Sequence, residues 1–178
     1  DSAAPKTYKE FLRNLWDPYP EIGLDNPFAA FALQDKVLRV INTYLGLCAH
    51  FYYLTLNLTE PVGEEAPPVQ SQRWHRDPED KKMCKVFIYL TDVDEGAGPF
   101  IYVRGSQYGG PLGRLFPQQP PRGRVIAEEE IRQAVPGEEI MTCKGKAGTV
   151  IFCDTVGIHR GGYAAQNRRL MFTAGYCS

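Results

Sequence analysis

The chain has 178 residues, enough for one folded domain with a buried core and too few for two of ordinary size. Its 20 basic and 21 acidic residues leave a formal net charge of -1, which lacks the positive excess typical of nucleic-acid-binding proteins. No apolar run approaches the ~18 residues that a membrane span needs, and the first residues of this sequence do not have the charged-then-apolar pattern of a leader. We therefore expect a single domain over residues 1–178 with a small-molecule partner, and neither nucleic acid nor a membrane as partner.

The cysteines point to a reducing environment. Five of them are widely spaced and form no C-x-x-C pair of the kind found in zinc knuckles or redox motifs. Separated thiols in odd number are typical of buried free cysteines. We expect a cytoplasmic protein, and the sequence leaves the oligomeric state open.

The first 47 residues are expected to form helices that flank the rest of the domain. Helical spacing of apolar residues predicts helices over residues 6–15 and 28–45, and Gly46 is placed to end the second. From residue 48 the chain is rich in aromatic and β-branched residues, which favour strands. The predicted strands cover residues 50–58, 71–77, 84–93, 99–106, 147–154 and 168–176.

Residues 107–146 form an excursion between these strands. Proline and glycine are frequent over residues 107–124, and a short helix is predicted over residues 127–135. Long irregular segments in compact domains are often functional, so we expect a lid or a substrate-binding loop here. Its arginines Arg114, Arg122 and Arg124 are candidates for binding an anionic group, with a solvated surface as the alternative.

This pattern predicts a mainly β fold with N-terminal helices. Short strands separated by turns about every ten residues are typical of a barrel or a sandwich, here with helices on one outer face. Long parallel βαβ units and glycine-rich phosphate motifs are missing from the sequence, which argues against Rossmann and P-loop folds.

The octet SQRWHRDP at residues 71–78 contains three neighbouring side chains that could take part in catalysis or metal binding, in the triplet His75-Arg76-Asp77. A kinase catalytic loop is excluded because it needs an Asn five residues after the Asp, where this chain has Lys82. A metal site fits better, because side chains in an extended segment alternate with period two and place His75 and Asp77 on one side. Arg76 is then expected to point the opposite way.

A third metal ligand must come from elsewhere in the chain. His159 follows a predicted strand in DTVGIHRGG, where a short turn would hold it at a barrel mouth, whereas His50 is expected to be a structural strand residue. Two histidines and one carboxylate leave open metal positions, which suits non-haem Fe(II) and its reaction with O2. Zinc accepts the same three ligands, and a lone His-x-Asp is a common accident, so the residues alone leave these alternatives open.

Arg168 and Arg169 open the last predicted strand, and neighbours alternate, so one of them at most faces inward. A cation inside a barrel needs a carboxylate, and the guanidinium fork can hold one through two hydrogen bonds. A 2-oxo-dicarboxylate that chelates iron would present its far carboxylate there. The alternative is that both arginines are solvent-facing charges at a strand end.

The segments SQRWHRDPEDKKMCKVFIYLTDVDEGAGPFIYVRGS, GKAGTVIFCDTVGIHRGG and NRRLMFTAGY resemble the phytanoyl-CoA dioxygenase family of Fe(II)/2-oxoglutarate-dependent oxygenases, over about residues 50–176. The resemblance implies a double-stranded β-helix, a jelly roll of the cupin-like kind, with its core over residues 48–176. It implies that His75, Asp77 and His159 bind Fe(II). It also implies that Arg168 pairs with the distal carboxylate of 2-oxoglutarate, with Arg169 as the reserve candidate.

Further expectations follow from the same resemblance. Gln72 is a candidate for a hydrogen bond to cosubstrate or substrate, with a polar residue at a strand start as the alternative. Some relatives have a small hydroxyl residue two positions after the distal His, where this chain has Gly161. Halogenating members usually lack the carboxylate ligand, so Asp77 favours hydroxylation or a related oxidation. The implied reaction consumes O2 and 2-oxoglutarate and releases succinate and carbon dioxide, while the alternatives are a zinc-dependent hydrolase with the same three ligands and a non-catalytic jelly-roll binding module.

Overall fold

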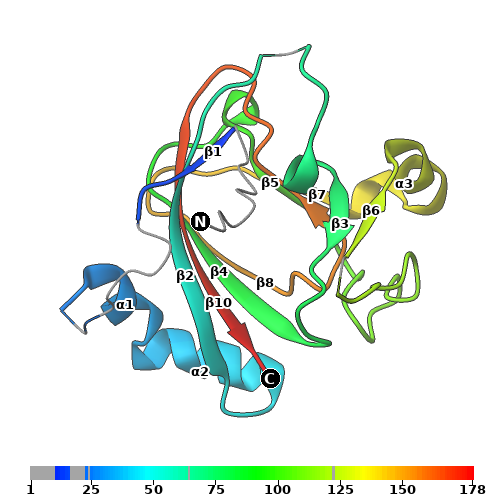
Figure 1. Ribbon diagram of the computed structural model, residues 1–178. Helices are drawn as coiled ribbons and strands as arrows, with labels where there is room; N and C mark the ends of the chain where they lie inside the picture. Colours follow the sequence, from blue (N-terminus) through cyan, green and yellow to red (C-terminus); the bar gives the residue numbers. More distant parts are fainter. Residues whose placement is uncertain (1–10, 17–22, 24, 64, 122) are drawn as a thin grey trace, which may run out of the picture.

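The computed structural model describes residues 11–16, 23, 25–63, 65–121 and 123–178. Two antiparallel five-stranded sheets face each other as the walls of a jelly roll (Figure 1). The first sheet has the order β1 (Leu12–Asn14), β2 (His50–Thr59), β10 (Arg169–Cys177), β4 (Met83–Tyr89) and β8 (Val150–Cys153). The second has the order β6 (Arg124–Ile126), β3 (Trp74–Arg76), β9 (His159–Arg160), β5 (Phe100–Val103) and β7 (Ile140–Cys143). The predicted mainly β fold is therefore confirmed.

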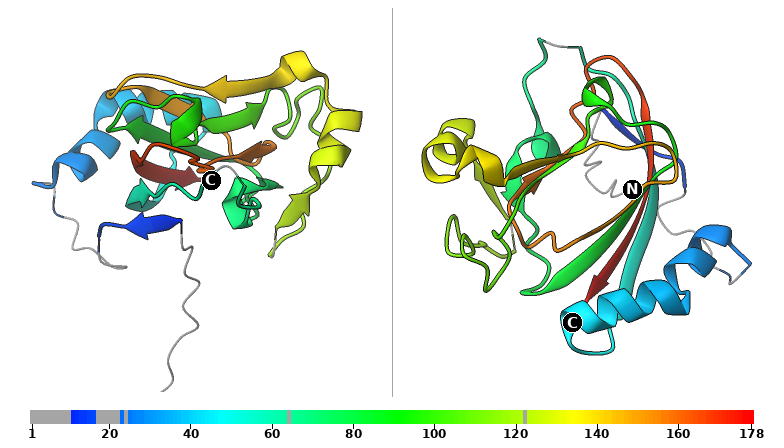
Figure 2. Two further views of the ribbon diagram at one scale, coloured as in Figure 1. Left: turned by 90° about the horizontal axis from the view of Figure 1, so that it is seen from above. Right: turned by 180° about the vertical axis from the view of Figure 1, so that it is seen from behind.

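The two N-terminal helices, α1 (Pro27–Ala32) and α2 (Asp35–Leu45), pack on the outer face of the first sheet (Figures 1 and 2). Alternate residues of β10 reach this layer: Phe172 lies 5.1 Å from Phe28 between ring centroids, and the Tyr176 hydroxyl donates to the Ala32 carbonyl at 2.7 Å. The other residues of β10 consequently face the space between the sheets.

The expected helix over residues 28–45 is divided in two. The Asn26 side chain caps α1 by accepting from the backbone N–H groups of residues 28 and 29, and Gln34 leaves helical geometry with ψ of 147° before α2 begins. Gly46 ends α2 with φ of 76°, a left-handed conformation that glycine adopts without steric cost, as predicted.

The helix predicted over residues 6–15 is wrong where the structure describes it. Residues 6–10 lie outside the described part, but Leu12–Asn14 forms the edge strand β1 and pairs with Asn57–Thr59 of β2. Backbone groups along that side of β2 offer hydrogen bonds that a three-residue segment takes up regardless of its local propensity.

The excursion at residues 107–146 is more ordered than expected. Its predicted helix is α3 (Glu128–Ala134), and β6 and β7, which were not predicted, form the two edges of the second sheet. Ile126 and Ile131 pack α3 against the outer face of that sheet together with Trp74, Val103 and Ile158. The described residues also form three short 3-10 helices: η1 (Gln70–Gln72), η2 (Glu95–Ala97) and η3 (Gly137–Glu139).

The part of the chain that the structure describes contains no helix that could span a membrane. Its helices are all too short or too polar to cross a bilayer.

Candidate metal centre

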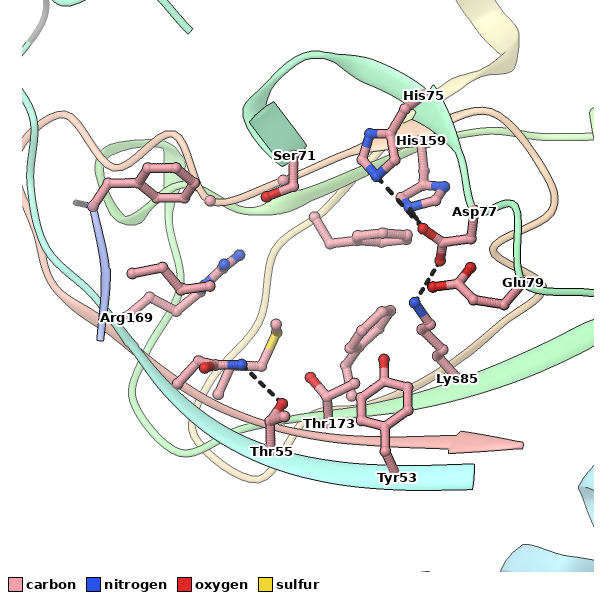
Figure 3. Close-up of a pocket in the computed structure, with 18 residues that line it drawn as sticks. Tyr53, Thr55, Ser71, His75, Asp77, Glu79, Lys85, His159, Arg169 and Thr173 are labelled. Atoms are coloured by element: carbon pink, nitrogen blue, oxygen red, sulfur yellow. Dashed lines mark hydrogen bonds and ion pairs between the residues drawn. The ribbon is translucent and has the colours of Figure 1, made fainter. Parts of the chain in front are cut away.

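Three potential metal ligands meet on the inner face of the second sheet. His75 lies on β3, Asp77 follows that strand directly, and His159 lies on β9, in register with His75. Both Nε2 atoms approach Asp77 Oδ1, at 3.7 Å from His75 and 3.8 Å from His159 (Figure 3). One ligand atom from each residue lies within 4.8 Å of the others. The structure thus brings together the three residues predicted as ligands.

His159 is held by a strand rather than by the turn predicted from sequence. The two-residue strand β9 pairs on one side with β3 and on the other with β5, where His159 lies opposite Tyr102. The Asp77 backbone N–H in turn donates to the Thr155 carbonyl at 3.0 Å, which ties the end of β3 to the segment before β9. All three ligands therefore sit on hydrogen-bonded backbone, which favours a fixed arrangement.

Both imidazoles are oriented by the backbone. His75 Nδ1 lies 2.8 Å from the Arg73 carbonyl and His159 Nδ1 lies 2.9 Å from the Gly157 carbonyl. A carbonyl can only accept, so each Nδ1 carries the proton and each Nε2 presents its lone pair to the cluster. Burial, reinforced by the neighbouring His75 ring, lowers the pKa of His159 to about 3, which leaves it neutral and able to bind a metal at physiological pH.

Lys85 reaches this cluster from β4 in the opposite sheet, and the sequence reasoning missed it. Its Nζ lies 2.5 Å from Asp77 Oδ2, and the Lys85 side chain is 11% exposed. Burial opposes ionisation of the Asp77 carboxyl, but the neighbouring His159 ring and the Lys85 ammonium hold its pKa below the usual range. A signal existed, because a lysine inside the apolar run CKVFIYL needs a buried carboxylate partner.

The structure reverses the predicted preference between the two arginines. Arg168 is exposed, and its Nε donates to Glu60 Oε2 at 2.7 Å outside the cavity. Arg169 is 3% exposed and points inward with Met171 and Thr173, the other residues on its face of β10. The order follows from strand register, which pairs Arg169 with Thr59 and turns its side chain toward the second sheet.

Arg169 keeps hydrogen-bonding capacity inside the protein. Its Nη1 donates to the Gly98 carbonyl at 2.5 Å and its Nη2 to the Thr59 hydroxyl at 3.3 Å. Its Nε is buried and has no hydrogen-bond partner among the described residues. A buried donor without a partner costs free energy unless a ligand satisfies it, so this cation is suited to an anion in the cavity.

The ligand cluster and Arg169 line one cavity of about 270 Å³ between the two sheets. Figure 3 shows Arg169 on one side of it and the two imidazoles with Asp77 on the other. Phe87 and Phe100 contribute apolar walls, whereas Thr55, Asn57 and Thr173 add polar ones. Candidate metal ligands on one side and a buried arginine on the other suit a dicarboxylate bound to a metal at one end. The cavity volume lies slightly below the usual range for ligand pockets.

Gln72 does not belong to this cavity. It is 1% exposed, its Oε1 accepts from the Val69 N–H at 2.9 Å, and its Nε2 donates to the Gly162 carbonyl at 3.2 Å. Its amide joins η1 to the chain after β9, which agrees with the alternative of a structural polar residue. Gly161 lines the cavity without a hydroxyl, and Thr59 places one beside Arg169 instead.

Arg76 points away from the ligands, as predicted, and is almost fully buried. Its Nη1 donates at 2.6 Å to the carbonyls of Ser106 and Val156, its Nη2 to Leu115 at 2.7 Å, and its Nε to Phe116 at 2.8 Å. Arg76 therefore fastens the 106–116 loop and the segment before β9 to the back of β3.

Of the three candidate arginines in the 107–146 excursion, the two that the structure describes do not line this cavity. Arg114 is exposed, and Arg124 pairs with Glu130 at 3.2 Å and lies 5.2 Å from the Phe116 ring centroid, so neither lines the cavity. Arg122 lies outside the described residues. His50 is an exposed residue at the start of β2, in agreement with its predicted strand role.

Comparison with known proteins identifies similar sequences and folds. A sequence model of the phytanoyl-CoA dioxygenase family matches residues 6–169. No curated protein matches the chain. Similar solved structures include the epimerase SnoN in complex with Fe3+, alpha ketoglutarate and nogalamycin RO, with a TM-score of 0.62 and 18% identity over 83% of this chain and 57% of SnoN.

Two further structures have the same overall fold. EctD from S. alaskensis, with 2-oxoglutarate and 5-hydroxyectoine, has a TM-score of 0.60 and 20% identity over 85% of this chain and 52% of EctD. EvdMO1 has a TM-score of 0.58 and 21% identity over 84% of this chain and 32% of EvdMO1. The chain thus spans between a third and three fifths of these proteins, and at such identities the likeness shows the jelly-roll fold.

Proposed function

The chain belongs to the phytanoyl-CoA dioxygenase family, and on that premise we propose that it is an Fe(II)- and 2-oxoglutarate-dependent dioxygenase that hydroxylates or otherwise oxidises an unactivated C–H bond of a small molecule. One observation carries the proposal: a single cavity has His75, Asp77 and His159 on one side and the buried Arg169 on the other. SnoN and EctD, whose structures hold iron or 2-oxoglutarate on the same fold, support it by analogy.

The three ligands fit Fe(II) by their chemistry. Two neutral imidazoles and one carboxylate on one side of a cation leave its other positions open for a chelating cosubstrate and for O2. When bound, Fe(II) with 2-oxoglutarate and O2 supplies the oxidising chemistry, with succinate and carbon dioxide as coproducts. The protein supplies the fixed Nε2 atoms, one carboxylate oxygen and a cavity with apolar walls.

Arg169 is the residue that we propose for the distal carboxylate of 2-oxoglutarate. It is buried, it faces the cavity, and its Nε has no hydrogen-bond partner among the described residues. A guanidinium holds a carboxylate through two parallel hydrogen bonds, and the Thr59 hydroxyl, which accepts from Nη2, helps to orient this one.

Hydroxylation is the outcome favoured by the ligand set. Asp77 occupies the third ligand position, which halogenating relatives usually leave without a carboxylate. SnoN is an epimerase on the same fold, so the fold itself does not select the outcome. The assignment of hydroxylation therefore rests on Asp77 and is tested by the product.

A zinc-dependent hydrolase with the same three ligands is the alternative. A zinc site with a bound water does not require a buried arginine across the cavity. The free energy cost of burying the Arg169 charge would then not be offset by a ligand. Arg169 thus favours the oxygenase over the hydrolase.

Turnover of 2-oxoglutarate tests the proposal. Metal-free protein reconstituted with Fe(II) should form succinate from 2-oxoglutarate under air, and a metabolite library should contain compounds that stimulate it. Activity should disappear in His75→Ala and Asp77→Ala but persist in His50→Ala, which removes an exposed histidine. Tightly bound zinc with no succinate formed across the library would contradict the proposal.

A further inference from the structure

A buried lysine touches the candidate carboxylate ligand. Lys85 lies inside the first sheet, where β4 pairs with β10 on one side and with β8 on the other. Its side chain crosses the cavity, and its Nζ lies 2.5 Å from Asp77 Oδ2 (Figure 3). A buried cation requires a carboxylate, and Asp77 provides it.

The surroundings of Lys85 hold its ammonium at this place. The Tyr53 ring on β2 lies beneath it, with Nζ 5.5 Å from the ring centroid. On β10, between Lys85 and Tyr53, stands Gly175, where an added Cβ would lie 2.4 Å from Tyr53 Cε1. The missing side chain at Gly175 leaves room for this ring, and the ring in turn stabilises the ammonium through a cation–π contact.

The two oxygens of Asp77 therefore have different neighbours. Oδ1 faces the Nε2 atoms of His75 and His159 at 3.7 and 3.8 Å, whereas Oδ2 accepts the charge-assisted bond from Lys85. A carboxylate can bind a metal through one oxygen or through both. Because Oδ2 is hydrogen-bonded to Lys85, Asp77 would offer only Oδ1 to a metal and would occupy only one of its coordination positions.

A different role for Lys85, as the binding group for an anionic ligand, is less well supported. Its ammonium is already paired with Asp77, while Arg169 across the cavity has a buried nitrogen without a partner. The group with unused hydrogen-bonding capacity is therefore Arg169, and Lys85 acts on the ligand set.

We propose that Lys85 is a positioning residue that restricts Asp77 to one-oxygen metal coordination and offsets part of its charge. This inference rests on the proposed metal site. It predicts an unusual sign: loss of the ammonium should tighten metal binding, because it removes a like charge beside the cation and releases Oδ2 to bind as well. Turnover should fall at the same time, since the second oxygen occupies a position needed by a reactant.

Cobalt(II) serves as the probe, because its absorption spectrum in the visible range reports coordination and its affinity can be titrated without turnover. In Lys85→Met we expect the Co(II) Kd to fall by about tenfold or more and the spectrum to change. Lys85→Arg, which keeps the charge, should retain a spectrum like that of the wild type. Lys146→Met is the matched control, since it removes an exposed Lys–Asp pair, with Asp92, distant from the cavity.

The outcomes separate the inference from the proposed function. Equal or weaker Co(II) binding in Lys85→Met with an unchanged spectrum would overturn the inference, even if the wild type turns over 2-oxoglutarate. A wild type that binds no Co(II), or binding that survives His159→Ala, would overturn both. If Lys85→Met fails to fold, Lys85→Gln removes the charge but keeps a donor for Oδ2, so it should still tighten Co(II) binding, by a smaller factor and with a spectrum like that of the wild type; no tightening in that variant also overturns the inference.

Discussion

Replacement of Arg169 by methionine is expected to weaken 2-oxoglutarate binding strongly. The side chain is 3% exposed, so a carboxylate bound to it would be screened little by water. Loss of a charge-assisted, two-bond contact costs about 3 kcal/mol, of the order measured for truncating buried charge pairs. This free energy corresponds to roughly a hundredfold rise in Kd.

The neighbouring arginine provides the control for this prediction. Arg168 carries the same side chain, but it is exposed and pairs with Glu60 at the surface, where such pairs contribute about 0–1 kcal/mol. Binding of 2-oxoglutarate to the metal-loaded, anaerobic protein can be followed calorimetrically in Arg169→Met, Arg169→Lys and Arg168→Met. We expect Arg168→Met to bind like the wild type and Arg169→Lys to lie between the two. A larger loss in Arg168→Met than in Arg169→Met would refute the assignment.

Three further predictions concern stability. Arg76→Met should lower the free energy of unfolding in urea by about 3 kcal/mol or more, because buried carbonyls lose their donor, whereas the exposed Arg104→Met should change it by under about 0.5 kcal/mol. Gly175→Ala should cost about 1–3 kcal/mol through its clash with Tyr53, and an equal cost in a Tyr53→Ala background would contradict this. The metal-free protein should lose stability as pH falls from 6.5 toward about 3, because His159 takes up a proton in this range in the unfolded chain but not in the folded one. Melting temperatures of His159→Gln that depend on pH as strongly as those of the wild type would contradict this.

The sequence was sufficient to predict that the three candidate metal ligands lie together, because part of their arrangement depends on short-range geometry. Period-two alternation alone places His75 and Asp77 on one side of a strand and Arg76 on the other. His159 could be added because the chain has only three histidines and one of them follows a strand. The structure brings these residues together as expected, and their role in binding iron remains a prediction.

The choice between Arg168 and Arg169 could not be made in the same way. Alternation shows that one of two neighbours faces inward, but the face is set by pairing with another strand. Here Arg169 lies opposite Thr59 of β2, and that register is a long-range property. Gln72 was a candidate from the family resemblance, and its hydrogen bond to Gly162, 90 residues along the chain, is a tertiary contact that the local sequence does not reveal.

Three of the four strands that the sequence did not predict are short edge strands, and the fourth, β9, has two residues inside the second sheet. Strands β1, β6 and β7 have three or four residues each, too few for a clear hydrophobic alternation. They form because a neighbouring strand offers unpaired backbone groups. For Lys85 the reason is different: the apolar run around it predicts a strand, but a charge inside such a run also requires a buried partner, which the run itself does not identify.

The hydrogen bonds of Arg76 connect the loop behind β3 with the candidate metal site on the other side of this three-residue strand. The guanidinium holds the 106–116 loop through the loop's carbonyls, while the residues before and after Arg76 belong to the candidate metal site. A shift of this loop would pull on β3 from behind and move His75 and Asp77 relative to His159. Cleavage of the 106–116 loop by a protease should therefore become slower once a metal is bound. The protease sensitivity of this loop would then report whether the buried site is occupied.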